Sequence, residues 1–300
     1  MMPLAPIVLF VYNRLWHTRQ TVEALQKNTL AARSELFIYS DAPKNEDAQK
    51  SVKEVRDYIK TIDGFKKVTI IERDKNWGLA DSIIDGVTKI VKQYGTIIVL
   101  EDDLVTSPCF LQFMNEALKF YKDEKKVWHI SGYTPPLEKI EHHFFIQPTT
   151  CWGWATWTDR WAYFKKDTAY FLEKFDKKTV KEFNINNTYD YYSHIVLNHQ
   201  HKINTWAIFW YASSYFNGGL SLHPKKSFVQ NIGHDDSGTH CAGSCDYDVT
   251  LAVTCDNDFP SEISIKRENT AALERYYKRL KPSLFKRAVY KAIKYAKGII

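Results

Sequence analysis

The sequence predicts an α/β fold in which helices flank a mostly parallel sheet. In the first half, short apolar runs of strand length alternate with segments that have the 3.6-residue periodicity of helices. Acidic side chains follow two of these apolar runs directly. With 300 residues, of which 44% are hydrophobic and 25% charged, the chain has the composition of a globular protein with a large core. No apolar run approaches the ~18–20 residues of a membrane span.

The elements expected up to Ser131 follow one another in order. Apolar runs predict buried strands at Pro6–Val11, Leu36–Tyr39, Val68–Ile71, Thr96–Leu100 and Val127–Ser131. Apolar residues at helical spacing predict helices at Thr18–Lys27, Val52–Ile62, Leu79–Tyr94 and Phe110–Tyr121. Strands that alternate with helices pair in parallel, and the ligands of such sheets bind at the carboxyl ends of the strands.

Positive charge is concentrated at the C-terminal end of the chain. The net charge is +6, but residues 275–300 carry many basic side chains and no acidic one. The rest of the chain has slightly more acidic than basic residues. A nucleic-acid-binding protein carries a basic patch on its folded body, so we expect no nucleic-acid partner.

The same end predicts a basic amphipathic helix. In residues 284–300, apolar side chains such as Phe285, Val289 and Ile293 share one helical face, while lysines and an arginine occupy the others. A helix of this kind binds the surface of an anionic membrane. The alternative is a helix docked on the body with its basic face in water. We favour peripheral membrane contact.

Cysteine usage and the N-terminus bear on the compartment. Five cysteines, at positions 109, 151, 241, 245 and 255, form an odd and scattered set, which favours a reducing compartment. The first apolar run has no positive segment before it and no small-residue cleavage site after it, so we expect no signal peptide. We therefore expect a cytoplasmic protein, peripheral to the inner face of the cytoplasmic membrane.

Three consecutive acids, Glu101, Asp102 and Asp103, follow the strand Thr96–Leu100. A buried and unpaired charge is costly, so such a cluster needs a cation or hydrogen-bond donors. Mg²⁺ and Mn²⁺ suit these hard oxygen ligands, and they bind through one or two carboxylates with phosphate and water. The cluster predicts a divalent metal site that holds a diphosphate; the alternative is a solvated acidic loop.

Several segments carry a family resemblance. Residues 98–110, IVLEDDLVTSPCF, are similar to the metal-site segment of GT-A glycosyltransferases, above all the eukaryotic β-1,2-N-acetylglucosaminyltransferases. VYNR at 11–14 resembles the nucleotide-binding turn of that family, and IYSD at 38–41 resembles the segment whose acid contacts uracil. Residues 128–132, followed by Gly153-Trp154, resemble its run toward the acceptor side. CWGWATW at 151–157, NIG at 231–233 and GTH at 238–240 resemble bacterial sugar transferases of surface polysaccharides.

The resemblance covers roughly residues 5–240 and implies a GT-A fold, with a Rossmann-like, mostly parallel central sheet flanked by helices. The implied organisation is a nucleotide-sugar-binding half at 1–145 and an acceptor-binding half of the same domain at 146–268. A basic amphipathic tail at 269–300 completes the chain.

The resemblance also implies roles for individual residues. Asp103 coordinates the metal, Mn²⁺ or Mg²⁺, while Glu101 and Asp102 hold hydroxyl groups of the ribose and the donor sugar. Asp41 accepts a hydrogen bond from the uracil N–H, and Arg14 lies near the diphosphate. Two further candidates are Asn76, before the helix that closes over the donor, and His240, as a late metal ligand. The alternative for His240 is a hydrogen-bonding loop histidine.

The general base is not assigned by the resemblance. The eukaryotic family places an aspartate between two tryptophans, but the corresponding stretch here, WAIFW at 206–210, contains no acid. Asp190, Asp235 and Asp236 are the remaining candidates. We favour Asp235 and Asp236, which lie in a glycine-flanked loop; the alternative is that this loop is a solvated turn.

Six of the nine tryptophans lie within residues 144–220. Trp154, Trp157 and Trp161 have the spacing of one helix face, which favours a buried stripe. The alternative is a platform on which an acceptor sugar stacks, with Trp152 and Trp154 as its candidate members.

These expectations converge on one reading of the chain. It is a metal-dependent, inverting hexosyl- or N-acetylhexosaminyltransferase that moves a sugar from a nucleotide donor, UDP-linked by resemblance. The acceptor is a hydroxyl of a growing bacterial surface glycan, which can be lipid-linked. The alternative is a catalytically silent GT-A module that binds glycan or membrane partners.

Overall fold

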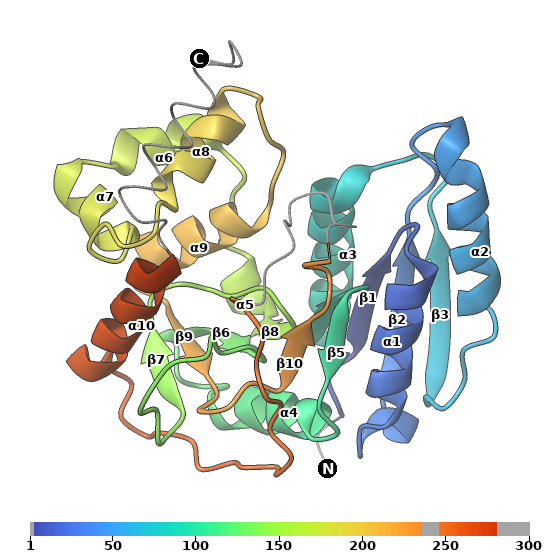
Figure 1. The fold of residues 1–300 in the computed structure, drawn as a ribbon, viewed down its shortest axis with the longest axis horizontal. Coiled ribbons are helices and arrows are strands. Elements are labelled where there is room, and N and C mark those ends of the chain that lie inside the picture. The colour runs from blue at the N-terminus through green and yellow to red at the C-terminus, as the bar shows by residue number, and fades with distance from the viewer. Residues whose placement is uncertain (1–2, 236–245, 281–300) are drawn as a thin grey trace.

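The structure, a computed structural model, describes residues 3–235 and 246–280. Its centre is an eight-stranded sheet with the order β3-β2-β1-β4-β8-β6-β9-β7 (Figure 1). The strands are β1 (Ile7–Val11), β2 (Glu35–Ser40), β3 (Lys67–Glu72), β4 (Thr96–Glu101), β6 (Val127–Ser131), β7 (Phe144–Ile146), β8 (Trp154–Trp157) and β9 (Leu220–His223). A separate antiparallel pair is formed by β5 (Leu104–Thr106) and β10 (Val229–Asn231).

Helices cover both faces of the sheet. They are α1 (Leu15–Gln26), α2 (Gln49–Ile59), α3 (Gly78–Tyr94), α4 (Phe110–Phe120), α5 (Thr158–Trp161), α6 (Thr168–Lys174), α7 (Lys177–Phe183), α8 (Tyr192–His199), α9 (Ala207–Phe216) and α10 (Arg267–Leu280), with 3-10 turns η1 (Ala31–Arg33) and η2 (Glu46–Ala48). Apolar residues of α1, α2 and α4 share one core cluster with alternate residues of β1, and those of α3 share a second cluster with the others. The parallel half is therefore doubly wound, as the sequence predicts.

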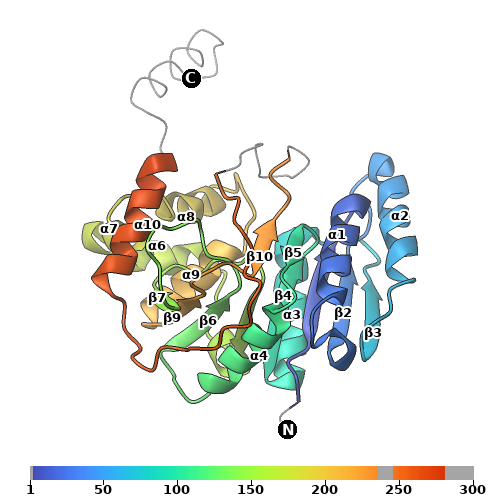
Figure 2. The ribbon, with the colours of Figure 1, turned by 60° about the horizontal axis from the view of Figure 1, so that its bottom comes forward.

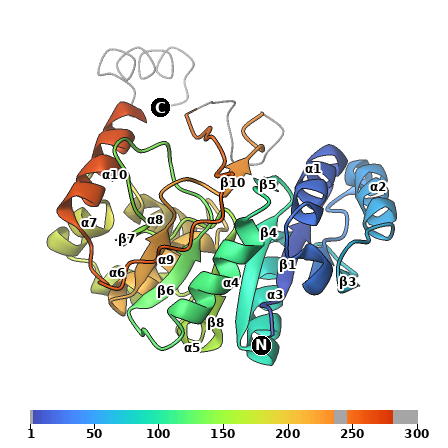
Figure 3. The same ribbon diagram turned by 90° about the horizontal axis from the view of Figure 1, so that it is seen from below.

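The parallel half of the sheet brings three strand ends together. β3, β2, β1 and β4 pair in parallel, and Phe10 of β1 lies opposite Tyr39 of β2 and Glu101 of β4. The turns that follow β1, β2 and β4 therefore lie at one edge, where Arg14, Asp41 and the acidic cluster are found. Figure 3 shows β5 and β10 side by side beyond the end of β4.

The second half mixes strand directions and adds helices. β8 pairs antiparallel with both β4 and β6, β6 is parallel to β9, and β7 is antiparallel to β9. Helices α6 to α10 gather on the side of the molecule away from α1 and α2 (Figures 1 and 2). One sheet thus runs through both halves of the chain.

The α/β expectation is confirmed, and every strand and helix predicted up to Ser131 is present with ends within three residues of the prediction. The helical interpretation of the tryptophan spacing is wrong. Trp154 and Trp157 lie at the two ends of β8, on opposite faces of the sheet, and only Trp161 is helical. Because both faces of β8 are covered, the strand lacks the alternation that would have identified it.

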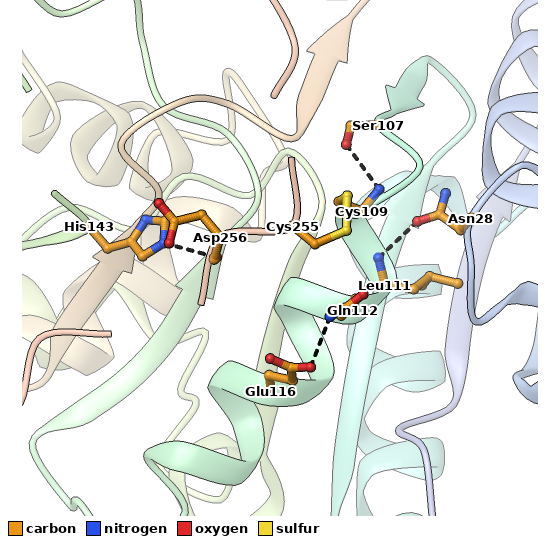
Figure 4. The surroundings of a disulfide bond; sticks show 9 residues. All are labelled: Asn28, Ser107, Cys109, Leu111, Gln112, Glu116, His143, Cys255 and Asp256. Carbon is orange, nitrogen blue, oxygen red and sulfur yellow. Dashed lines mark hydrogen bonds between the residues drawn. A yellow bond between two sulfur atoms is a disulfide. The ribbon is translucent and has the colours of Figure 1, made fainter. Parts of the chain in front are cut away.

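A disulfide that the sequence did not predict joins Cys109 to Cys255 (Figure 4). Cys109 precedes α4, and its backbone N–H donates to Ser107 Oγ at 3.1 Å. On the other side of the bond, Asp256 accepts at its backbone carbonyl from His143 Nε2 at 3.1 Å. The bond ties the segment that leads to α10 to the start of α4. The two cysteines are 146 residues apart in the sequence, so no local spacing pattern predicts their pairing.

The C-terminal region is described as far as Leu280. Helix α10 is docked, with Ala272, Leu273 and Tyr276 buried, so the first part of the predicted 269–300 tail packs on the body. The amphipathic helix predicted at 284–300 lies outside the described residues. In the ranges 3–235 and 246–280, no helix combines the length and the apolar character that crossing a bilayer requires.

Candidate active site

The three acids form a tight turn between β4 and β5. Glu101 is the last residue of β4, Asp102 and Asp103 make the turn, and Leu104 begins β5. Asp102 and Asp103 are buried, and Glu101 is partly buried. Thr21 of α1 fixes the turn, because its Oγ1 donates to the Asp102 carbonyl at 2.8 Å and accepts from the Leu104 N–H at 3.0 Å.

Arg14 pairs with two of the acids. It follows β1, and its Nη2 donates to Asp102 Oδ1 and, at 2.7 Å, to Asp103 Oδ2. Burial alone would lower the pKa of Arg14, but the two carboxylates raise it above its ordinary value. Its other terminal nitrogen, Nη1, is buried and has no hydrogen-bond partner among the described residues. An unsatisfied buried donor is costly, so Nη1 is placed to donate a hydrogen bond to an anionic ligand.

The cluster carries more negative charge than Arg14 neutralises. Burial, with the charges of Asp103 and Asp102, raises the pKa of Glu101 to about 8. Burial is also the main cause that raises the pKa of Asp102 to about 6, and Asp103 adds to it while Arg14 opposes it. Glu101 therefore keeps its proton near neutral pH unless a further cation lowers its pKa.

The segment after β10, residues 232–235, crosses the acidic turn, and we call it the strap. The Ile232 N–H donates to the Asp103 carbonyl at 2.9 Å, which continues the β10–β5 pairing past its last bridge. The next residue, Gly233, lies directly against the carboxylate. A Cβ at Gly233 would overlap Asp103 Oδ2 and lie 3.1 Å from Arg14 Nη1. Only glycine leaves room for this approach.

Asp41 and Asn76 are hydrogen-bonded to each other, and the Asp41 carboxylate supports the start of α3. The two carboxylate oxygens of Asp41 accept from the backbone N–H groups of Ala42, Trp77 and Gly78 and from Asn76 Nδ2, at 2.8 to 3.1 Å. Asp41 thus caps the start of α3. With four bonds on two oxygens, it has little capacity left for the uracil N–H that the resemblance assigns to it.

The structure separates the candidates for the general base. Asp235 ends the strap, and its Oδ2 lies 3.0 Å from Nε2 of His17 in α1. Asp190 instead lies between α7 and α8, where its Oδ1 accepts from Asn184 Nδ2 and the Ser193 N–H. Asp236 lies outside the described residues, as does the metal-ligand candidate His240. Among the candidates that the structure describes, Asp235 is the one beside the acidic turn.

The two tryptophans proposed for the acceptor differ in exposure. Trp154 has no exposed surface and stacks on Trp206 and His129, so the acceptor contact expected of it is corrected to a role in the core. Trp152 is partly exposed and lies edge-on to His234 and Tyr247. It lies next to the strap and keeps its expected role as a prediction.

Two residues at the site, His17 and Thr21, were not singled out from the sequence, and Cys151 and Gly233 appeared there only as members of resemblance segments. His17 and Thr21 lie on the face of α1 that is turned toward β5, and each bonds to a residue far along the chain. Burial and the neighbouring charge of Glu101 raise the pKa of the Cys151 thiol. Polar residues at i and i+4 among the buried positions of this helix were the available signal for the first two.

The site suits a divalent cation held by few protein ligands. In the described ranges no three His, Cys, Asp or Glu side chains converge to hold a metal by themselves. Mg²⁺ and Mn²⁺ do not require such a set, since one or two carboxylates suffice when phosphate oxygens and water complete the shell. The residual charge of the acidic turn and the orphaned Arg14 Nη1 fit a metal and a phosphate together, with Asp103 as the residue that would hold the metal.

In open α/β sheets ligands bind at the carboxyl ends of the parallel strands, which is where the acidic turn and Arg14 lie. The profile of Glycosyl transferase family 2 matches residues 7–188, more than half of the chain. The chain therefore belongs to glycosyl transferase family 2, and the expectation of a GT-A glycosyltransferase fold is confirmed. Among curated proteins, no sequence matches this one.

Solved structures resemble the chain at low identity. The mannosyltransferase PcManGT from Pyrobaculum calidifontis, in complex with GDP-Man and Mn²⁺, shares 11% identity at a TM-score of 0.41, with 72% of each chain covered. TarS of S. aureus shares 10% at 0.43, covering 77% of this chain and 37% of TarS. Apo mouse xyloside xylosyltransferase 1 shares 10% at 0.35, covering 70% and 80%. At these values the likeness concerns the fold alone.

Proposed function

We propose that this protein is a metal-dependent, inverting glycosyltransferase that uses a UDP-linked donor. It would move a hexosyl or N-acetylhexosaminyl group to a hydroxyl of a growing bacterial surface glycan. The observation that carries the proposal is the turn Glu101–Asp103, three carboxylates that face one guanidinium at the carboxyl edge of a parallel sheet. A solvated acidic loop would not be buried, braced by Thr21 and covered by the strap.

The chain's own residues have distinct tasks in this proposal. Asp103 would hold Mn²⁺ or Mg²⁺, which when bound would neutralise the charge that develops on the departing diphosphate. Arg14 Nη1 would bind a diphosphate oxygen, and Asp102 and Glu101 would accept hydrogen bonds from hydroxyl groups of the donor. Asp41 would keep the start of α3 in place beside the nucleotide rather than read the base.

Asp235 is the proposed general base. As the acceptor oxygen forms its bond to the anomeric carbon, the bond from that carbon to the diphosphate oxygen breaks, and UDP leaves with the electron pair. Asp235 takes the proton of the acceptor hydroxyl. Attack from the face opposite the leaving group inverts the anomeric centre. Inversion and the UDP donor rest on the resemblance to the β-1,2-N-acetylglucosaminyltransferases.

The acceptor side of the proposal rests on the sequence. A lipid-linked glycan would be met at a membrane surface, and the basic amphipathic pattern of residues 284–300 suits the inner face of the cytoplasmic membrane. Trp152, partly exposed beside the strap, would contact the acceptor sugar.

Calorimetric titration of UDP with and without Mn²⁺ tests the proposal. We expect UDP binding that requires Mn²⁺ and disappears in Asp103→Ala. The matched control is Asp123→Ala, an exposed aspartate at the opposite, amino end of β6, which should bind as the native protein does. Equal UDP binding without metal would give the acids a structural role. Metal-dependent binding with no release of UDP from UDP-sugars would favour the catalytically silent module.

A further inference from the structure

Beside the proposed base lies a histidine that no role described so far uses. His17 belongs to the first turn of α1, three residues after Arg14, and it is buried. Its Nε2 lies 3.0 Å from Asp235 Oδ2. A carboxylate only accepts hydrogen bonds, so Nε2 carries the hydrogen and donates it.

The His17 ring is itself held in place. Trp16, the preceding residue, packs edge-on against it, with ring centroids 4.9 Å apart and an interplanar angle of 89°. Trp16 is 58% exposed, so its indole lies at the surface beside the buried His17 ring. The donor atom is thus fixed by the helix backbone, by burial and by an aromatic contact.

Asp235 is otherwise tied to the site through the strap. Two peptide units separate it from Gly233, which limits their Cα separation to about 7 Å. Gly233 lies against Asp103 and Arg14, so Asp235 stays close to Asp103, the proposed metal ligand. The Asp235 side chain is 44% exposed. The bond from His17 holds Oδ2 at 3.0 Å from Nε2, on a ring that is itself buried.

We propose that His17 is the positioning residue for Asp235, holding its carboxylate so that Oδ1 faces the attacking hydroxyl group. The inference rests on the proposed function, because it requires Asp235 to act as the base. His17 touches neither donor nor acceptor in this scheme. A base held in one orientation removes the proton more effectively than one that samples several rotamers.

Three variants test the proposal: His17→Leu, His17→Gln and Asp235→Asn. The measured reaction is Mn²⁺-dependent release of UDP from UDP-glucose, UDP-galactose, UDP-N-acetylglucosamine and UDP-N-acetylgalactosamine, with water as the acceptor. We expect His17→Leu to lower kcat by roughly tenfold to a hundredfold with an unchanged KM for the donor. His17→Gln keeps an N–H at similar reach and should retain most of the activity. His199→Leu, at an exposed histidine of α8, should match the native enzyme.

The double variant separates positioning from a structural role. Combined with Asp235→Asn, the change His17→Leu should cause no further loss of kcat, because its effect acts through the base. Independent, multiplicative losses would overturn the proposal. So would a His17→Leu variant that raises the KM for the donor at unchanged kcat, since His17 would then only hold the strap.

The proposed function is checked on the same samples. Native enzyme that releases UDP while His17→Leu equals it in kcat and KM contradicts this inference alone. Native enzyme that releases no UDP from any of the four donors contradicts the proposed function, and the inference falls with it. Titration of UDP and Mn²⁺ then shows whether the nucleotide site remains.

Discussion

Arg14 Nη2 lies 2.7 Å from Asp103 Oδ2, so the turn after β1 is bonded to the turn after β4. The two strands are adjacent and parallel, and a single guanidinium therefore bridges their carboxyl ends. Arg14 occupies the place between Asp102 and Asp103 where a cation is most strongly attracted. A bound metal would share these carboxylates with Arg14. A bound diphosphate would give the unused Nη1 of Arg14 an anionic partner.

Removing the Thr21 hydroxyl should loosen the acidic turn. Thr21→Val keeps the volume but leaves the Asp102 carbonyl and the Leu104 N–H without their buried partner. We expect the free energy of unfolding to fall by about 1–3 kcal/mol, measured by urea denaturation. Thr61→Val removes an exposed hydroxyl bond and should cost far less. Equal losses in the two variants would mean that the turn is held by other contacts.

A side chain at Gly233 should disturb the nucleotide site. The Cβ of Gly233→Ala meets Asp103 Oδ2, so either the strap lifts or the carboxylate turns. We expect the affinity for UDP in the presence of Mn²⁺ to fall roughly tenfold, about 1.4 kcal/mol. The control is Gly218→Ala, where φ is +69° and nothing lies within 4 Å of the new Cβ. Gly218→Ala should lose stability but keep its affinity for UDP. Unchanged affinity for UDP in Gly233→Ala would mean that the strap does not lie against Asp103 when UDP binds.

Two buried histidines should make the protein sensitive to acid. Burial, reinforced by the charge of His223, lowers the pKa of His129 to about 3, and burial lowers that of His223 to about 4. As the pH falls below about 6.5, the unfolded chain binds protons that the folded protein does not bind, so the free energy of unfolding falls. His129 contributes a slope of about 1.4 kcal/mol per pH unit between about pH 4 and 5.5, and His223 approaches that slope only near pH 5.

The variant His129→Gln isolates one of these contributions. Its amide can accept from Trp210 Nε1 and donate to the Thr150 carbonyl, the two partners of the imidazole. Urea denaturation at several pH values should show that the free energy of unfolding changes less steeply with pH in this variant than in the native protein. His199→Leu should keep the native slope, and a native slope in His129→Gln would show that His129 titrates normally.

Loss of the disulfide should lower stability without altering the acidic turn. Cys109→Ala combined with Cys255→Ala opens a loop with a sequence separation of 146 residues. We expect a loss of about 2–5 kcal/mol in the free energy of unfolding, with Mn²⁺-dependent UDP binding retained at low temperature. Dithiothreitol should destabilise the native protein and leave the double variant unchanged. A native protein that is indifferent to the reductant would show that the bond contributes little.

Local patterns sufficed for the parallel half. Each strand from Ile7–Val11 to Thr96–Glu101 is a short apolar run, and each helix between them shows one apolar face. The acidic turn was also predictable, because three charges after a buried strand conflict with packing and therefore indicate a ligand.

What the sequence left open depends on pairing across long separations. His17 meets Asp235, and Cys109 meets Cys255, and no local pattern encodes either contact. The tryptophan spacing misled because β8 is buried on both faces, so helix and strand patterns looked alike. Asp41 was expected to read a base, whereas the backbone N–H groups after β3 take its lone pairs.

The order in which the site is assembled along the chain has a consequence for synthesis. Arg14, Thr21 and the acidic turn all lie before β5 in the sequence, but the strap that covers the turn follows β10, at residues 232–235. On the ribosome, the strands around the acidic turn emerge long before their cover. The nascent chain therefore presents an open, hydrated acidic turn to the cations of the cell before the strap can close over it.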